Sequence, residues 1–156
     1  MGLRIGHGAR SARWPGRRRI TTALVMGACA LVLAGCAPLS QTMTDAAAQG
    51  RSAVETASLA LELEQHGRAL FGVSATAFDD AERELSDAAR TVSEADVATD
   101  EERTLRAETR DAIRAGLDAV DAARESMQGL VDADAAADAL EAASARLNAL
   151  VQAGEG

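Results

Sequence analysis

The last proline of the chain is Pro38, so residues 39 to 156 contain no residue that obliges a helix to break. Proline interrupts a helix because its ring clashes with the preceding turn and it has no backbone N–H to donate. Alanine, the best helix former, is the commonest residue of the chain. The sequence therefore predicts an all-α fold after Pro38.

Three short breaks divide this helical stretch. Gly72 followed by Ser74 is typical of a helix end and a new N-cap. Thr99, with a glutamate three residues later, matches a capping box, in which two side chains satisfy free backbone N–H groups at a helix start. Gly129 followed by Asp132 marks the third break. We expect four helices, over residues 44 to 71, 74 to 95, 100 to 128 and 132 to 153.

Each expected helix carries one apolar face. In the second helix, apolar residues recur at alternating steps of three and four, the spacing of one side of a helix. These residues are Phe78, Ala81, Leu85, Ala88, Val92 and Ala95. The third helix has the widest stripe, with Leu117 in its middle. Because short connections force neighbouring helices to run antiparallel, we predict an up-down-up-down four-helix bundle in which alanine allows close approach.

The expected core is thin. From residue 41 onward the large apolar residues are 11 Leu, 7 Val, 1 Ile and 2 Phe. Chains with less than about 20 per cent of such residues and a high net charge approach the composition of disordered proteins. We therefore expect strong helices over a marginal core, either in a monomer of low stability or in a bundle that a partner completes.

The first part of the chain follows a different pattern. Six arginines, with no acidic residue among them, precede an uncharged run over residues 20 to 34. This order is typical of a secretory signal peptide. A membrane-spanning helix needs about 20 apolar residues, and the run is shorter than that. The sequence therefore predicts a targeting segment.

The last residues of this run, Leu33 and Ala34, together with Gly35 and Cys36 after it, resemble the lipobox of bacterial lipoproteins. The resemblance implies that the chain is cut before Cys36, whose thiol carries a diacylglycerol anchor. It also implies a location on the extracytoplasmic face of the cell membrane. The resemblance covers only the leader and Cys36. Arg17 to Arg19 match half of a twin-arginine export signal, so both export routes stay open.

On this basis the chain divides into three parts. Residues 1–35 are the signal peptide, residues 36–43 a lipidated tether, and residues 44–156 the helical bundle domain. All 24 acidic residues follow Cys36 but only 10 of the 16 arginines do, which gives the processed chain a net charge of −14, against −8 for the whole chain. Such a chain repels nucleic acid, so we expect no nucleic-acid partner.

Candidate catalytic and metal-binding residues are few. His66 is the only histidine after Cys36, and Glu62 lies one turn before it on the same helix face. A carboxylate and histidine pair can bind a metal or relay a proton, but di-iron bundles draw Glu-x-x-His motifs from two helices. Acidic stretches such as Asp79-Asp80 lack the ligand order of a calcium-binding loop. We predict no catalytic residue, metal or cofactor, and hence no enzyme.

A ridge of four arginines along the third helix departs from the acidic background. It consists of Arg103, Arg106, Arg110 and Arg114, which we call the arginine ridge. One interpretation is a contact surface for an anionic partner. The other is a solvated face neutralised by acidic residues of the second helix or by Glu102, Asp111 and Asp118.

These observations predict a lipid-anchored, non-catalytic interaction or structural module of the cell envelope. Its partner would be another envelope protein or a polymer, and self-association stays open. The alternative is a lipoprotein that binds a small ligand or ion in a pocket between helices. Its candidate polar residues are His66, Arg68 and Arg124.

Overall fold

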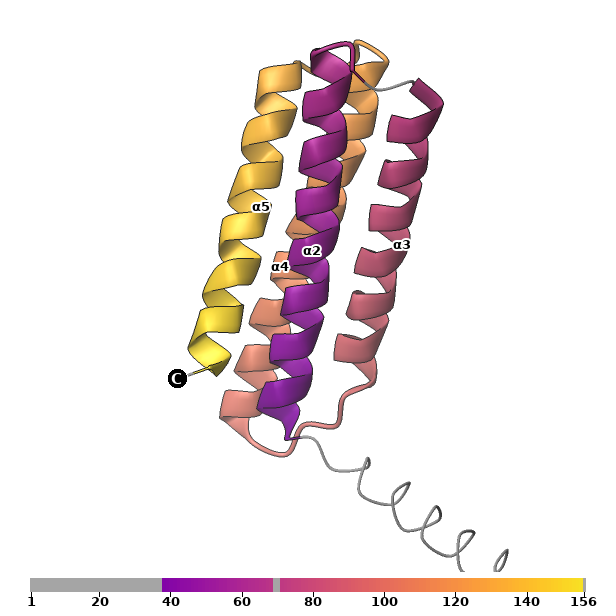
Figure 1. The fold of residues 1–156 in the computed structure, drawn as a ribbon. Helices are drawn as coiled ribbons and strands as arrows, with labels where there is room; N and C mark the ends of the chain where they lie inside the picture. Colours follow the sequence, from indigo (N-terminus) through magenta and orange to yellow (C-terminus); the bar gives the residue numbers. More distant parts are fainter. Residues whose placement is uncertain (1–37, 69–70, 156) are drawn as a thin grey trace, which may run out of the picture. The chain divides into compact units, whose positions relative to one another are not determined.

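The computed structural model describes residues 38–68 and 71–155. Within these ranges the chain forms four helices and no strand. The helices are α2 (Leu39–Gln65), α3 (Phe71–Glu94), α4 (Asp100–Met127) and α5 (Ala133–Gly154). Figure 1 shows the four helices side by side, each running opposite to the one before it in sequence. The predicted all-α four-helix bundle is confirmed.

The predicted signal peptide, the lipobox residues Leu33, Ala34 and Gly35, and the anchor residue Cys36 lie outside the described residues. In the described part of the chain, no helix combines the length and the apolar character needed to cross a bilayer.

The bundle packs around α2. This helix contacts α3, α4 and α5, whereas the described parts of α3 and α5 do not contact each other. The buried face of α2 consists mostly of small residues. They include Ala46, Ala47, Gly50, Ala53, Ala57 and Ala60. Small side chains allow two helix backbones to approach closely, so α2 reaches α4 across the diagonal of the bundle.

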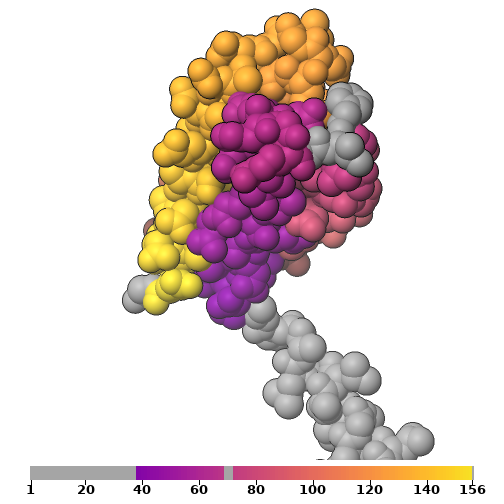
Figure 2. All heavy atoms as spheres, turned by 45° about the horizontal axis from the view of Figure 1, so that its top comes forward, coloured from indigo at the N-terminus to yellow at the C-terminus, as the bar shows by residue number. Residues whose placement is uncertain are grey.

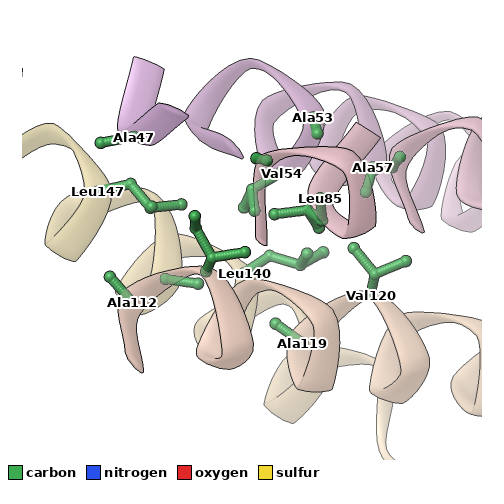
Figure 3. Close-up of a cluster of buried hydrophobic side chains, with 14 of the residues drawn as sticks. Ala47, Ala53, Val54, Ala57, Leu85, Ala112, Ala119, Val120, Leu140 and Leu147 are labelled. Carbon is green, nitrogen blue, oxygen red and sulfur yellow. The ribbon is translucent and has the colours of Figure 1, made fainter. Parts of the chain in front are cut away.

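Larger side chains from the other helices fill the space beside α2. Leu85 of α3 and Leu140 and Leu147 of α5 are completely buried, and Figure 3 shows all three projecting into the space between the helices. Of the apolar residues predicted for the second helix, those within α3 are buried, and Ala95, just after α3, is partly buried. Leu117, placed in the middle of the widest predicted stripe, is also only partly buried.

The break between α2 and α3 occurs at Gly67 and not at Gly72 as predicted. Gly67 has a φ of +64°, a conformation that glycine adopts without steric cost. Its N–H donates to the carbonyl of Glu64 at 2.9 Å. The N–H of Arg68 donates to the carbonyl of Leu63 at 2.8 Å. These two bonds form a Schellman motif, which satisfies free carbonyls at the end of α2.

Gly72 and Ser74 lie inside α3, so the predicted stop and new cap at these residues are wrong. Ser74 is buried, and its hydroxyl donates to a carboxylate oxygen of Glu64 at 3.0 Å. The serine therefore connects α3 to the end of α2 and does not begin a helix.

α2 begins at Leu39, so residues 39–43, predicted as part of the tether, are helical. Met43 is 1 per cent exposed and belongs to the core. Because Met43 is buried in the core, the additional first turn of α2 packs as part of the bundle. The segment between Cys36 and α2 is therefore only Ala37 and Pro38.

The predicted capping box at the start of α4 is confirmed. Thr99 Oγ1 accepts the N–H of Glu102 at 3.1 Å. Glu102 Oε2 in turn accepts the N–H groups of Ala98 at 2.7 Å and Thr99 at 3.0 Å. The bonds from Ala98 and Thr99 lower the pKa of Glu102, because they stabilise the charged carboxylate.

The predicted break between α4 and α5 is also confirmed. Gly129 has a φ of +72° and closes α4 in a second Schellman motif. The Asp132 side chain then accepts the N–H groups of Asp134 and Ala135, each at 3.1 Å, and caps α5.

Candidate functional site

A groove of about 830 Å³ runs along the bundle between α2 and α5. Figure 2 shows these two helices side by side on the surface, α2 in indigo to magenta and α5 in yellow. The α2 wall includes Arg51, Glu55, Ser58, Leu59, Glu62 and Gln65. The α5 wall includes Ala137, Glu141, Ser144, Ala145 and Asn148. We call this feature the α2–α5 groove.

Small residues between two cross-helix contacts leave the groove open. At one end Arg51 Nη1 donates to Asn148 Oδ1 at 2.8 Å. At the other end Gln65 Nε2 donates to the Ala133 carbonyl at 3.4 Å. Between these contacts the walls carry serine and alanine side chains, including Ser58, which are too short to fill the space. With a rise of 1.5 Å per residue, the stretch from residue 51 to 65 is about 21 Å long.

The groove is lined by carboxylates and by apolar side chains. Arg51 is already engaged, because it bonds to Asn148 and its Nε lies 3.4 Å from Glu55 Oε1. Glu62 and Glu141 are exposed and form no ion pair among the described residues. Leu59 is 56 per cent exposed. The surface thus offers carboxylates and an aliphatic side chain to a cationic, partly apolar partner.

The arginine ridge lies on α4, but its four members do not share one role. Arg106 is half-buried, and its Nη1 donates to the carbonyl of Ala95 at 3.2 Å, where the chain leaves α3. Arg103 pairs with Asp100 in the first turn of α4. Arg106 therefore connects α4 to the segment just after α3, whereas Arg103 forms an ion pair within α4.

Arg110 and Arg114 are exposed to solvent, as is Arg103. Arg110 is exposed and contacts Asp111 at 3.3 Å. Arg114 is exposed and forms no ion pair within the described part of the chain. Of the acids expected to neutralise the ridge, Asp111 pairs with Arg110, whereas Glu102 is used in the capping box.

The residues suggested for a polar pocket in the core do not form one. His66 is exposed at the end of α2, and its Nδ1 lies 2.7 Å from the Glu62 carbonyl. Because a carbonyl oxygen only accepts, this nitrogen is the donor. Arg124 Nη2 lies 2.7 Å from Asp79 Oδ1 and connects α4 to α3, and Arg68 is exposed. In the described ranges, no three His, Cys, Asp or Glu side chains are grouped to hold a metal ion.

The groove residues Arg51 and Asn148 were not predicted from the sequence. They are 97 positions apart, and neither belongs to a recognisable motif. Only the register of α2 against α5 brings them together, and a sequence signal for that register is absent.

Comparison of the chain with protein-family models, with curated proteins and with solved structures found no match. A function is therefore inferred from the residues of this chain alone.

Proposed function

We propose that this chain is a bacterial lipoprotein whose processed form is a non-catalytic helical interaction module of the cell envelope. Acylated Cys36 would hold it on the extracytoplasmic face of the membrane. The observation that carries the proposal is the position of Cys36, which directly follows the leader and lies three residues before α2.

The short connection would fix the bundle close to the membrane. An extended chain covers at most about 3.6 Å per residue, so the Cα atom of Leu39 would lie within about 11 Å of that of Cys36. The first turn of α2 would therefore lie near the lipid headgroups. The connection between α3 and α4 lies at the same end of the bundle (Figure 1).

Charge at that end favours attachment through the lipid and not through the protein surface. Glu94, Asp96, Asp100 and Glu101 are exposed there. Anionic headgroups attract basic segments and repel acidic ones. The acyl chains would therefore provide the binding energy, while the sides of the bundle stay accessible.

The α2–α5 groove supports an interaction role. Its ionisable side chains are carboxylates and the engaged Arg51, and its described walls contain no histidine or cysteine. A second candidate is binding of a small cationic ligand in the groove, because about 830 Å³ falls within the range of ligand sites.

The anchor can be tested with two cysteine variants. Cells that express the full chain as wild type, Cys36→Ala or Cys29→Ala would be fed an alkyne-bearing fatty acid, and the membrane fraction would be probed for label. Wild type and Cys29→Ala should be labelled, because Cys29 lies in the leader. Cys36→Ala should carry no label and keep its leader. Equal labelling of Cys36→Ala would refute the lipoprotein proposal.

A further inference from the structure

The two walls of the α2–α5 groove carry carboxylates at different heights. The hydrogen bonds at the two ends of the groove fix the register of α2 against α5. In this register Glu141 of α5 lies level with Ser58 of α2, and Glu62 lies farther from the start of α2 by about one turn, or roughly 6 Å. Leu59, which is 56 per cent exposed, lies between these heights. The groove thus presents an aliphatic side chain between two carboxylates.

The charge around these carboxylates is negative. Arg51 is the one basic residue that lines the groove in the described chain, and Asn148 and Glu55 engage it. Glu62 and Glu141 form no ion pair within the described ranges. Two further exposed acids lie on α5, each three residues before a residue that lines the groove: Asp134 and Asp138. The groove therefore calls for a partner that brings positive charge.

A second copy of the chain does not provide that charge at the right height. The two-residue connection before α2 would hold copies on one membrane at equal heights. Val54 lies against Gly116, which sets the register of α4 against α2. Of the arginines on the described helices, only Arg124 then lies at the height of the groove carboxylates, and acidic residues of α3 engage it. Arg68 follows the end of α2 and lies beyond both carboxylates.

The shape of the groove favours a helix as its occupant. All its lining residues except Leu61 are at least partly exposed, so the groove is open along its length of about 21 Å. Sites for small ligands are more enclosed, because they bury most of the ligand surface. An extended peptide would leave its backbone N–H and C=O groups without partners beside two helices, whereas a helix satisfies its own.

We propose that the α2–α5 groove binds an amphipathic helix of another envelope protein, with basic side chains on both flanks of an apolar stripe. The basic side chains pair with Glu62 and Glu141, and the stripe covers Leu59 and Ala145. The aliphatic stems of the basic side chains cover further apolar surface. This inference rests on the proposed function, because the lipid anchor makes the chain a neighbour of other envelope proteins.

Binding of a synthetic helix tests the site in the full chain, expressed with its leader and purified from membranes in a non-ionic detergent. The probe is a fluorescent peptide of about three heptads, with leucine and alanine at positions a and d and arginine at the flanking positions e and g. Fluorescence anisotropy should show saturable binding. A peptide of the same composition, with its arginines moved to the face opposite the leucines, should bind about tenfold more weakly. Equal binding of the two peptides, or no binding of the first, would overturn the proposal.

Matched variants separate the groove from the general acidity of the bundle. Glu62→Gln with Glu141→Gln should weaken binding of the first peptide about tenfold, because two ion pairs are lost. Glu84→Gln with Glu108→Gln changes the net charge equally, at exposed residues that do not line the groove, and should leave the affinity unchanged. Equal losses from the two pairs would show that only net charge matters and would contradict the site.

Charge reversal tests the pairing and the fold together. Glu62→Arg with Glu141→Arg should lose the arginine peptide and bind a glutamate version of it better than wild type does, which a misfolded chain would not do. No gain for the glutamate peptide contradicts the pairing.

The same preparations distinguish the other occupants and the anchor. Binding of a short alkyl diamine but not of the peptide would assign the groove to a small cationic ligand, and a dimer that excludes the peptide would assign it to a second copy. Either result overturns the proposal. Intact mass reports anchoring separately: an unlipidated chain that binds the peptide refutes only the proposed anchoring, and a lipidated chain that does not bind it refutes only the helix site.

Discussion

Arg51 of α2 and Asn148 of α5 are hydrogen-bonded across the two helices, with Nη1 2.8 Å from Oδ1. The bond closes one end of the α2–α5 groove and exists only in one register of the two antiparallel helices. The Nε of Arg51 is buried without a hydrogen-bond partner and has the Glu55 carboxylate 3.4 Å away. The packing of α2 against α5 thus fixes the position of Arg51, and the same packing forms the groove.

Leu85→Ala should strongly destabilise the bundle. Leu85 is completely buried and lies between α2 and α4, close to Gly50 and Gly116. Loss of a buried leucine costs about 2 to 5 kcal/mol, because it removes apolar contacts and leaves a cavity. Leu59→Ala is the matched control, since Leu59 is 56 per cent exposed and should change stability by about 0.5 kcal/mol or less. Urea unfolding followed by circular dichroism measures both, and equal losses would contradict the described core.

Two glycines inside helices should respond to alanine in opposite directions. Alanine favours a helix over glycine by about 0.8 to 1 kcal/mol. At Gly50 a Cβ would lie 3.4 Å from Leu147 Cδ2, so Gly50→Ala should raise the melting temperature. At Gly116 it would lie 3.0 Å from Leu85 Cδ2 and 3.1 Å from Val54 Cγ2. Overpacking there costs about 1 to 3 kcal/mol, so Gly116→Ala should lower the melting temperature. The reverse order in thermal unfolding would show that the core is arranged differently.

The capping box at Glu102 should make stability depend on pH. The bonds from Ala98 and Thr99 lower the pKa of Glu102 in the folded chain. Such a group stabilises the fold above the pKa of an unfolded glutamate, about 4.3, and this contribution is lost as the pH falls through the folded pKa. Glu102→Gln keeps an acceptor but does not titrate. Wild type should therefore exceed this variant in stability at pH 7, and the difference should shrink in acid. A difference that is constant between pH 7 and pH 2 would argue against the capping role.

Two members of the arginine ridge should differ in their effect on stability. Arg106 bonds to the Ala95 carbonyl, and its loss should cost about 0.5 to 1.5 kcal/mol. Arg110 is exposed and contacts only its neighbour Asp111 in the described chain, so Arg110→Gln should cost about 0.5 kcal/mol or less. Chemical denaturation of Arg106→Gln and Arg110→Gln compares the two. A larger loss at Arg110 would contradict the described contacts.

Local sequence signals predicted the structure correctly where residues within about one helical turn determine it. The capping box at Thr99 and the break from Gly129 to Asp132 depend on residues within four positions of each other, and both were predicted. The end of α2 was misplaced because both Gly67 and Gly72 can end a helix. Burial of Ser74 against Glu64 settles the choice, and this contact forms only in the packed bundle.

The groove depends on long-range packing and could not be predicted in the same way. Its carboxylates and small residues are ordinary surface residues of two separate helices. The arginine ridge was visible as a pattern, but its division between Arg106 and the exposed Arg110 and Arg114 depends on where α3 ends. Sequence periodicity gives the face of a helix, whereas the register of its neighbours decides which residues meet.

The intact mass of the processed protein, purified from membranes in detergent, tests the central proposal most directly. The proposal predicts a chain that begins at Cys36 and carries the added mass of a diacylglycerol group, with fragment ions that place the lipid on that residue. A chain that keeps residues 1–35, or that begins elsewhere without lipid, would contradict the assignment as a lipid-anchored module.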